Sequence, residues 1–230
     1  MERRHTDREY ERELETLREN VLMMGARVEE MIDNAMRAFS DRDAELAHET
    51  ILMDRQINRM ELEIDELCLK ILARRQPVAS DLRFITTTLK HVTDLERIGD
   101  LGVNICERVL ELCDEAPLGQ SAAILRIGEV ATGMLHDALD AFVAGDALKA
   151  EEVMKRDQRV DAYYAQLFPE LVASMMADPS KVYAATRLQS IGKYLERIAD
   201  HATNLAEMVV FMVKGKDVRH PSTAAKPEGE

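Results

Sequence analysis

Pairs of acidic or amide side chains four residues apart are the feature of this sequence best suited to chemistry. Four such pairs stand out, two from each half of the sequence: Asp54 with Asn58, Glu96 with Asp100, Asp157 with Asp161, and Glu196 with Asp200. Residues at i and i+4 share one face of an α-helix, so each pair presents its oxygen atoms to the same side. Oxygen ligands suit Mg²⁺, Mn²⁺, Ca²⁺ or iron better than zinc held by thiolates. We therefore expect divalent or trivalent metal ions at these pairs.

Long helices are expected to position the pairs. Apolar residues recur at intervals of three and four between residues 22 and 39, and again between 52 and 71, a period typical of amphipathic α-helices. Proline and glycine interrupt the pattern near residues 77, 117, 145 and 179. Ser80 and Asp178 are expected helix N-caps, with Pro179 in the first turn, where proline is tolerated. The pattern predicts six helices, at 8–40, 43–73, 80–113, 121–144, 146–176 and 180–213.

The two halves of the sequence repeat each other. The motif LERIGD at 95–100 returns as LERIAD at 195–200, and seven of the thirteen residues in 95–107 are identical in 195–207. Earlier parts of the halves align at an offset of 103, and we expect a loop-length change near residues 74–77 to absorb the difference of three. The sequence thus predicts an all-α tandem duplication of a three-helix bundle. Its expected parts are a first bundle at 1–116, a second at 117–213 and a polar tail at 214–230; end-to-end and side-by-side arrangements both remain open.

The acidic pairs are predicted to face each other within each bundle. On a helical projection with Glu96 at 0°, Asp100 lies at about 40° and the apolar residues lie at about 140–260°. In an antiparallel hairpin, the pair on the second helix can meet the pair on the third. The first group is then Asp54, Asn58, Glu96 and Asp100, and the second is Asp157, Asp161, Glu196 and Asp200. The second group has four carboxylates and the first has three, so we expect the second group to bind metal more tightly. The alternative is that these are solvated faces of charged helices.

Composition narrows the class of protein. Hydrophobic residues make up 46% of the 230 residues and aromatic residues only 4%, which favours a helical globular protein over an all-β one. A net charge of −13 repels phosphate backbones, so we expect no nucleic-acid partner. The sequence contains no G-x-S-x-G motif, Walker loop or G-x-G-x-x-G motif, so an enzyme is not indicated.

The sequence also indicates a cytoplasmic protein. Its N-terminus is charged and is followed by no apolar signal region. The longest apolar run near either end, residues 208–213, is far below the roughly 18 residues that span a bilayer. Cys68, Cys106 and Cys113 contain no C-x-x-C pair, and we expect buried, reduced thiols.

Two basic stretches lie outside the predicted core. One contains Arg74, Arg75 and Arg83, and the other runs from Lys214 to His220. Loops tolerate charge without a role in the core, so basic clusters in an acidic protein are candidates for steering a negatively charged partner. We expect these stretches to contribute to a partner-binding surface.

Six segments of the sequence carry a family resemblance. They are MGARVEEMIDNAMRAF, ARRQPVASDLR, DLERIGDLGVNICE, MLHDALDAF, YLERIADHATNLAE and VKGKDVRH. From about residue 10 to residue 220 the chain resembles the PhoU family of bacterial phosphate uptake regulators. The resemblance implies two pseudo-symmetric three-helix bundles whose E/D-x-x-x-D motifs hold metal ions, including multi-iron clusters in some members. Asn58 departs from that motif, and His201 replaces the Leu101 of the first copy, where it adds a ligand or fills space.

The resemblance also implies a function and partners. PhoU-like proteins are cytoplasmic negative regulators of phosphate uptake and of the phosphate-starvation regulon. The implied partners are the sensor histidine kinase and the ATPase of the phosphate ABC transporter, and we also expect a homodimer that meets the membrane only through its partners.

Two other classes remain open. The first is a helical-bundle carboxylate metal enzyme or metal buffer, although a ferritin-like di-iron site needs two Glu-x-x-His motifs and only residues 45–48 fit. The second is a plain coiled-coil scaffold, which the break in the apolar pattern about every 30 residues disfavours.

Overall fold

Six long helices form the described part of the protein, residues 8–216 and 218 of a computed structural model. They are α1 (Arg8–Asp41), α2 (Ala44–Arg74), α3 (Ala79–Leu112), α4 (Ser121–Ala144), α5 (Ala147–Ala177) and α6 (Val182–Lys214), with a short 3₁₀ helix, η1 (Pro179–Lys181), before α6. Every expected helix is present, and each begins and ends within two residues of its predicted bounds. The all-α prediction is confirmed.

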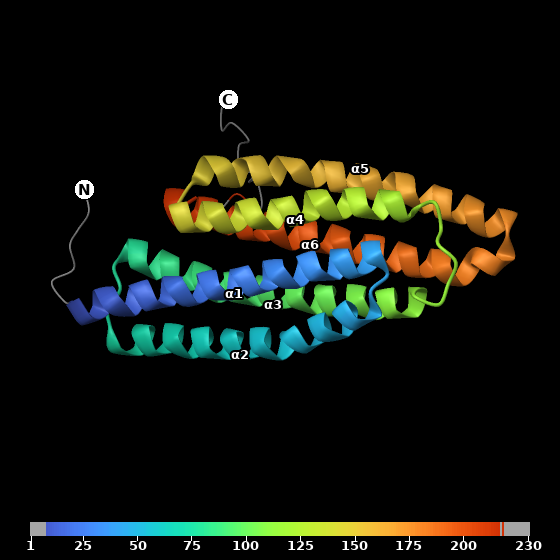
Figure 1. Ribbon diagram of the computed structural model, residues 1–230. Coiled ribbons are helices and arrows are strands. Elements are labelled where there is room, and N and C mark those ends of the chain that lie inside the picture. The colour runs from blue at the N-terminus through green and yellow to red at the C-terminus, as the bar shows by residue number, and fades with distance from the viewer. Residues whose placement is uncertain (1–7, 217, 219–230) are drawn as a thin grey trace, which may run out of the picture.

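The two three-helix bundles pack side by side, which the sequence left open (Figure 1). Within the described residues, α3 contacts α6 and α1 contacts α4 across the junction between bundles. The helix α2 contacts only α1 and α3, and α5 contacts only α4, α6 and η1. Each bundle therefore has one outer helix, and we call the outer surface along α2 and α3, and that along α5 and α6, the two outer grooves.

Two glycines allow α1 and α4 to approach closely. A Cβ atom on Gly25 would lie 2.8 Å from Leu139 Cδ2, and a Cβ atom on Gly128 would collide with Met36 Cε. Gly25 and Gly128 are 103 residues apart, and so are Met36 and Leu139. The same contact thus occurs twice, once on each side of the pseudo-symmetric junction. The repeat itself encodes the side-by-side packing.

The apolar stripes of the outer helices point inward. On α2, Ile57, Ile64 and Ile71 follow each other at intervals of seven residues, and each is at most 1% exposed. Burying such a side chain contributes about 1.5–3 kcal/mol relative to leaving it in water. This burial fixes the rotation of α2 about its axis, and with it the direction of the polar residues beside the stripe.

Equivalent aspartates begin the outer helices. The side chain of Asp43 accepts a hydrogen bond from the Leu46 amide at 2.9 Å, and that of Asp146 accepts one from the Leu148 amide at 2.9 Å. Asp178 is confirmed as an N-cap, although it caps η1 by accepting from the Ser180 amide at 3.1 Å. The expected cap at Ser80 is wrong, because α3 begins at Ala79 with no side-chain cap.

The three-residue difference between the two repeat offsets lies inside a helix and not in a loop. The connections 75–78 and 178–181 have the same length, so the expected loop-length change is wrong. Leu95 lies 16 residues after the start of α3, whereas its equivalent Leu195 lies 13 residues after the start of α6. Three residues are close to one helical turn, so the extra turn of α3 keeps its faces nearly aligned with those of α6.

Among the described helices, none combines the length and the apolar character needed to span a bilayer. The three cysteines are free thiols; Cys68 and Cys106 are buried and Cys113 is partly exposed. Burial raises the pKa of Cys68 and of Cys106 to about 12. Both thiols are therefore protonated at neutral pH and are poor nucleophiles.

Candidate functional site

The groove between α2 and α3 brings together the first group of expected ligands. Asn58 Nδ2 donates a hydrogen bond to Asp54 Oδ2 at 2.8 Å. Burial and then the nearby Asp100 carboxylate raise the pKa of Asp54, and burial and then Asp100 raise the pKa of Glu96. Side chains from the two helices therefore lie within electrostatic reach of each other, as the projection predicted.

Two oxygen atoms in this groove are buried without a donor. Asp54 Oδ1 and Asn58 Oδ1 have no hydrogen-bond partner among the described residues. A buried polar atom left unpaired costs about 1–3 kcal/mol, and most buried polar atoms in proteins are paired. Both atoms are acceptors, so a cation or a donor from outside the chain would satisfy them. The chemistry of the groove fits a hard metal ion.

Two further carboxylates extend the same groove, and the sequence reasoning missed them. Glu61 and Asp65 follow Asn58 on α2, and the four positions 54, 58, 61 and 65 fall within about 60° of one another around the helix. Burial raises the pKa of Glu61, and the carboxylates of Asp65 and Asp100 raise it further. Asp65 Oδ1 is also buried without a partner in the described chain. The groove therefore holds five carboxylates, not three.

The groove between α5 and α6 holds the second group. Burial raises the pKa of Asp157, as do the carboxylates of Asp161 and Glu196. The pKa of Asp200 is raised by burial and then by Glu196 and Asp157. All four expected residues thus influence one another across α5 and α6, and they repel each other when ionised.

The second groove differs from the first in two respects. Lys193 Nζ forms an ion pair with Glu196 Oε2, which neutralises part of the negative charge. The position of Lys193 in the first repeat is occupied by Thr93. At the positions equivalent to Glu61 and Asp65, the second repeat has Tyr164 and Phe168. The second groove is therefore the less acidic of the two.

The side chains do not stand in a finished coordination geometry. Within residues 8–216 and 218, no three His, Cys, Asp or Glu side chains converge closely enough to hold an ion as they stand. Mutual repulsion of carboxylates separates their oxygen atoms in the absence of a cation. An ion would draw them together by changing side-chain rotamers on two fixed helices.

His201 lies at the junction between the bundles, on the α3 side of α6. Its Nδ1 is 2.8 Å from Asp94 Oδ1 of α3, and Asn204 Nδ2 donates to the same oxygen at 3.4 Å. His201 therefore makes a polar contact between α6 and α3, a role that differs from the two considered from the sequence. Asn204 likewise faces the other bundle.

The expected basic surface is largely used within the protein. Arg75 forms ion pairs with Glu13 at 2.9 Å and with Glu9 at 3.1 Å. Arg83 Nε donates to the carbonyl of Met212 at 3.2 Å, next to the C-terminal end of α6. Residues 217, 219 and 220 of the expected surface lie outside the described residues. Arg75 and Arg83 therefore join helices and helix ends.

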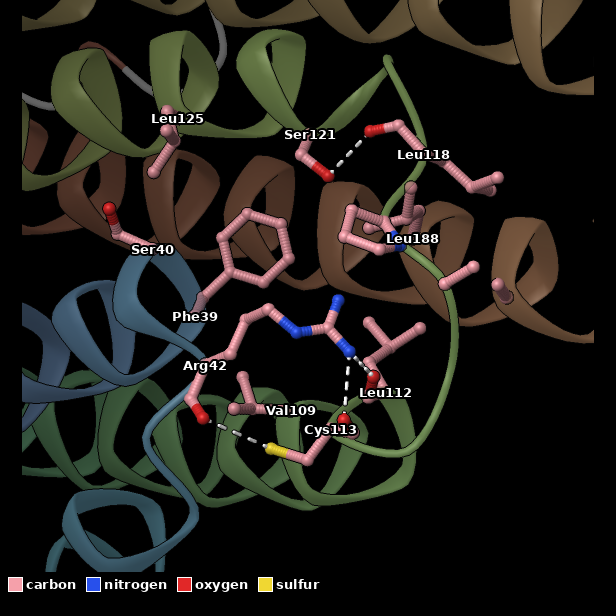
Figure 2. Close-up of a pocket in the computed structure, with 13 residues that line it drawn as sticks. Phe39, Ser40, Arg42, Val109, Leu112, Cys113, Leu118, Ser121, Leu125 and Leu188 are labelled. Atoms are coloured by element: carbon pink, nitrogen blue, oxygen red, sulfur yellow. Dashed lines mark hydrogen bonds between the residues drawn. The ribbon is translucent and has the colours of Figure 1, made fainter.

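An apolar cavity of about 270 Å³ lies at the junction of α1, α3, α4 and α6. Figure 2 shows Phe39, Leu118, Leu125 and Leu188 around it, with the Arg42 side chain running along one wall.

The polar groups of this cavity already have partners. Arg42 Nη2 donates to the carbonyls of Leu112, Cys113 and Glu115, which closes the C-terminal end of α3. Cys113 Sγ donates to the Arg42 carbonyl at 3.5 Å. These contacts join the connection between α1 and α2 to the end of α3 and the start of the linker, and since α4 and α6 also line the cavity, we interpret it as part of the joint between the bundles.

Comparisons with known proteins place this architecture in a family. A family model described as the PhoU domain matches twice, at residues 21–109 and 124–209. The phosphate-specific transport system accessory protein PhoU homolog of Pseudomonas putida is 43% identical over 218 residues, which are 94% of this chain and 85% of that protein.

Two solved structures are similar over nearly the whole fold. The crystal structure of PhoU from Pseudomonas aeruginosa is 42% identical with a TM-score of 0.87, covering 90% of this chain and 100% of that chain. The phosphate transport system regulatory protein PhoU from Streptococcus pneumoniae is 32% identical with a TM-score of 0.84, covering 91% of this chain and 99% of that chain.

Proposed function

Because the chain belongs to the PhoU family, we propose that it regulates phosphate uptake as an accessory protein of a phosphate-specific transport system. The observation that carries this proposal is the 43% identity to a transport accessory protein over 94% of the chain. Identity at that level over 218 residues extends well beyond the two LERI motifs. Relatives of this similarity are named accessory or regulatory proteins, so the proposed role is regulatory and not catalytic.

The finer proposal is a negative regulator that links two partners. It would restrain the phosphate ABC transporter and hold the sensor histidine kinase of the phosphate-starvation regulon in its inhibitory state. Two outer grooves on opposite sides of one rigid slab offer separate long surfaces to two partners. A change at one groove would then bias which partner is docked, because a ligand shifts an equilibrium by its differential affinity for the two states.

Deleting the gene tests this proposal. The deletion strain should express phosphate-scavenging genes in high phosphate, and expression of the wild-type chain from a plasmid should restore repression. Deletion strains that keep these genes silent in high phosphate would contradict the proposed regulation.

Co-purification with the transporter ATPase and with the kinase, scored separately, distinguishes the transporter role from the adaptor role. Light scattering of the purified protein tests the homodimer that we propose as the assembled form.

We further propose that both outer grooves bind divalent or trivalent metal ions such as Mg²⁺, Mn²⁺ or iron. Asp54, Asn58, Glu96 and Asp100 would hold the ion in the first groove, joined by Glu61 and Asp65; Asp157, Asp161, Glu196 and Asp200 would hold it in the second. The unpaired buried oxygens of Asp54 and Asn58 support this proposal. A bound cation supplies positive charge that removes the repulsion between carboxylates on facing helices.

Metal binding is tested on protein prepared free of metal. Adding an ion at a hundred times its dissociation constant should stabilise the fold by about 2.7 kcal/mol, because the ion binds only the folded form. Elemental analysis of protein purified without chelator identifies the native ion. A melting temperature that responds to none of the three ions would contradict the proposal.

The carboxylate grooves also suit a second class of protein, a metal enzyme or metal buffer. A metal enzyme predicts turnover of Fe²⁺ with O₂ by the purified protein, followed as oxygen consumption. The adaptor proposal predicts stoichiometric binding of the ion without turnover.

A further inference from the structure

A second kind of pocket lies on the other face of α5. It has a volume of about 300 Å³ and is formed by α4 and α5. Its lining residues are Arg126, Glu129, Val130, Gly133, Arg156, Arg159 and Tyr163. Three guanidinium groups thus share one pocket in a chain whose net charge is −13. Such a local concentration of positive charge opposes the charge of the whole molecule.

The positive charge of the pocket is only partly compensated. Arg156 Nη2 pairs with Asp137 Oδ2, and Lys149 Nζ lies 2.9 Å from the other oxygen of the same carboxylate. Asp137 is therefore shared between two cations, and hydrogen bonds from Lys149 and Arg156 hold its pKa below the usual value against the opposing effect of burial. Lys149 Nζ also pairs with Asp140 Oδ2 at 2.7 Å, so Asp137 and Asp140 together compensate Lys149 and Arg156, and the uncompensated charge of the pocket belongs to the other two arginines.

The other two arginines have no acidic partner in the described chain. Arg126 and Arg159 are exposed and form no ion pair with a described residue. Glu129 is the one carboxylate among the residues that line the pocket. Gly133 lines the same wall, where a Cβ would make only an ordinary contact with Arg156 Nη1 at 3.9 Å, so a longer side chain placed there would extend into the pocket. The pocket therefore offers guanidinium donors that the protein itself does not use.

The first repeat has the equivalent positions on α1 and α2, and they do not carry these charges. At the offset of 103, the equivalents of Arg126, Arg156 and Arg159 are Met23, Met53 and Gln56. The ion pair between Arg156 and Asp137 corresponds to a contact of Asn34 Nδ2 with Met53 Sδ at 3.9 Å. Helix packing is thus satisfied by uncharged side chains at the same positions. The arginines of the pocket between α4 and α5 are therefore not required to hold two such helices together.

We propose that this pocket binds an anion with a chain of phosphate groups, either inorganic or as part of a nucleotide. The planar guanidinium fork matches phosphate oxygens and can bind two of them at once. Three such groups around one pocket suit a ligand with several phosphates better than a single small anion. The phenol ring of Tyr163 in the wall offers a surface on which a nucleotide base can stack.

The site is separate from the carboxylate groove and does not depend on the proposed function. Arg156 and Arg159 lie about 100–160° around α5 from Asp157 and Asp161, so the two sites occupy different faces of one helix. Binding can therefore be measured without metal. Inclusion of EDTA removes ions that would otherwise bridge a phosphate ligand to the carboxylates.

The test is calorimetric titration of the full chain in EDTA with tripolyphosphate, ATP and orthophosphate. Two variants remove the site: Arg126→Gln with Arg159→Gln, and Gly133→Glu, which introduces the residue found at the equivalent position 30. The matched control, Arg55→Gln with Arg59→Gln, changes net charge equally on the exposed face of α2. We expect tripolyphosphate affinity to fall at least about tenfold in both site variants and less than about twofold in the control.

Comparing the titrated compounds also distinguishes an inorganic phosphate chain from a nucleotide. Equal affinity for tripolyphosphate and ATP supports recognition of the chain alone, and tighter binding of ATP supports a nucleotide stacked at Tyr163. Wild-type protein that binds neither compound at millimolar concentration overturns the proposal. An equal loss of tripolyphosphate affinity in the site variants and in the control also overturns the proposal. Orthophosphate that binds as tightly as tripolyphosphate overturns it as well. Circular dichroism confirms that each variant is folded.

Discussion

The two outer grooves of this protein descend from one repeated sequence, yet they offer different ligands. The α2–α3 groove has five carboxylates, because Glu61 and Asp65 extend the stripe along α2. At their equivalent positions the α5–α6 groove has Tyr164 and Phe168, and Lys193 neutralises part of the charge on Glu196. Side chains in a groove contact few residues of the core, so they can change without loss of the fold.

The junction between the bundles shows the opposite behaviour. The contact of Gly25 with Leu139 recurs as the contact of Gly128 with Met36, so the repeat has preserved a small residue against a long one. Interiors are close-packed, and a larger residue at either glycine must displace its neighbour. The comparison teaches that the repeat preserves how the helices pack and varies what the grooves bind.

The largest expected effect separates the two grooves by their metal affinity. Asp100→Ala should weaken binding of Mn²⁺ in the α2–α3 groove by about 100-fold or more, because loss of even an outer-sphere residue costs about 10- to 100-fold. Asp200→Ala should abolish the weaker site of the α5–α6 groove and leave the tighter site intact. This order reverses the one expected from the sequence, because the first groove gains two carboxylates and the second loses charge to Lys193. Calorimetric titration of metal-free protein measures both sites.

The apo-protein provides the control for this comparison. Asp100 raises the pKa of both Asp54 and Glu96, so it repels them at neutral pH. Its removal should leave the melting temperature of the metal-free protein unchanged or slightly raised. A lower melting temperature would show that Asp100 stabilises the fold and that its loss affects metal binding indirectly.

A second comparison concerns His91 and its equivalent in α6, Ile191. His91 is 1% exposed, its Nε2 lies 3.0 Å from the Leu205 carbonyl, and its ring meets Phe142 edge-on with centroids 4.6 Å apart. Burial lowers its pKa to about 4, although the Leu205 carbonyl and Asp94 oppose that shift. The unfolded chain, with a His pKa of about 6.5, therefore binds a proton more readily than the folded one. Stability should fall as the pH drops from 6.5 towards 4 and should not depend on this group above 6.5.

Replacing His91 by the isoleucine of the second repeat should remove this sensitivity. Between pH 7 and pH 5 the free energy of unfolding of the wild type should fall by about 2 kcal/mol more than that of His91→Ile. This follows because the contribution of His91 falls by about 1.4 kcal/mol for each pH unit below 6.5. Urea unfolding at the two pH values measures the difference, and the carboxylates cancel because both proteins contain them. Parallel losses in the two proteins would show that His91 takes up its proton without unfolding.

A third comparison sets Arg42 against Gly145, which is its equivalent in the second repeat. Both have a positive φ, 57° for Arg42 and 61° for Gly145. A side chain costs about 1–2 kcal/mol in this left-handed region, whereas glycine adopts it freely. Arg42→Ala keeps that cost and loses the hydrogen bonds to the end of α3, so it should be less stable than Arg42→Gly by about 1 kcal/mol. Urea unfolding of the two variants and the wild type measures the difference, and equal stability of the variants would indicate that the loop relaxes when the guanidinium is lost.

The helices were predictable because their apolar period and their breakers are local features of the sequence. The bounds of α1 to α6 differ from the prediction by at most two residues, and the cap expected at Ser80 has no role in α3. The side-by-side packing was not predictable, because the close approach of Gly25 to Leu139 joins residues more than a hundred positions apart.

The carboxylate pairs were predictable from spacing, but the extent of the first groove was not read fully. Glu61 and Asp65 have the same i, i+4 spacing as the other pairs, and a search for that spacing alone would have found them. The predicted pairs are those that both repeats share, whereas Glu61 and Asp65 have the uncharged equivalents Tyr164 and Phe168. The basic pocket between α4 and α5 escaped notice because its arginines come from two helices and meet only in the folded chain.

The smallest expected effect tests why the two grooves differ. Lys193 lies three residues before Glu196 and is 48% exposed, so its ion pair is worth no more than about 1 kcal/mol. Lys193→Gln should therefore raise the affinity of the α5–α6 groove for Mn²⁺ about three- to fivefold, by freeing Glu196 to face the ion. Thr93→Lys makes the reverse change, because it places a lysine three residues before Glu96, and it should weaken the α2–α3 groove by a similar factor. Titration of Lys193→Gln in an Asp100→Ala background isolates the second groove. If neither substitution changes the affinity of its groove, then the extra carboxylates Glu61 and Asp65, and not the lysine, account for the difference between the two sites.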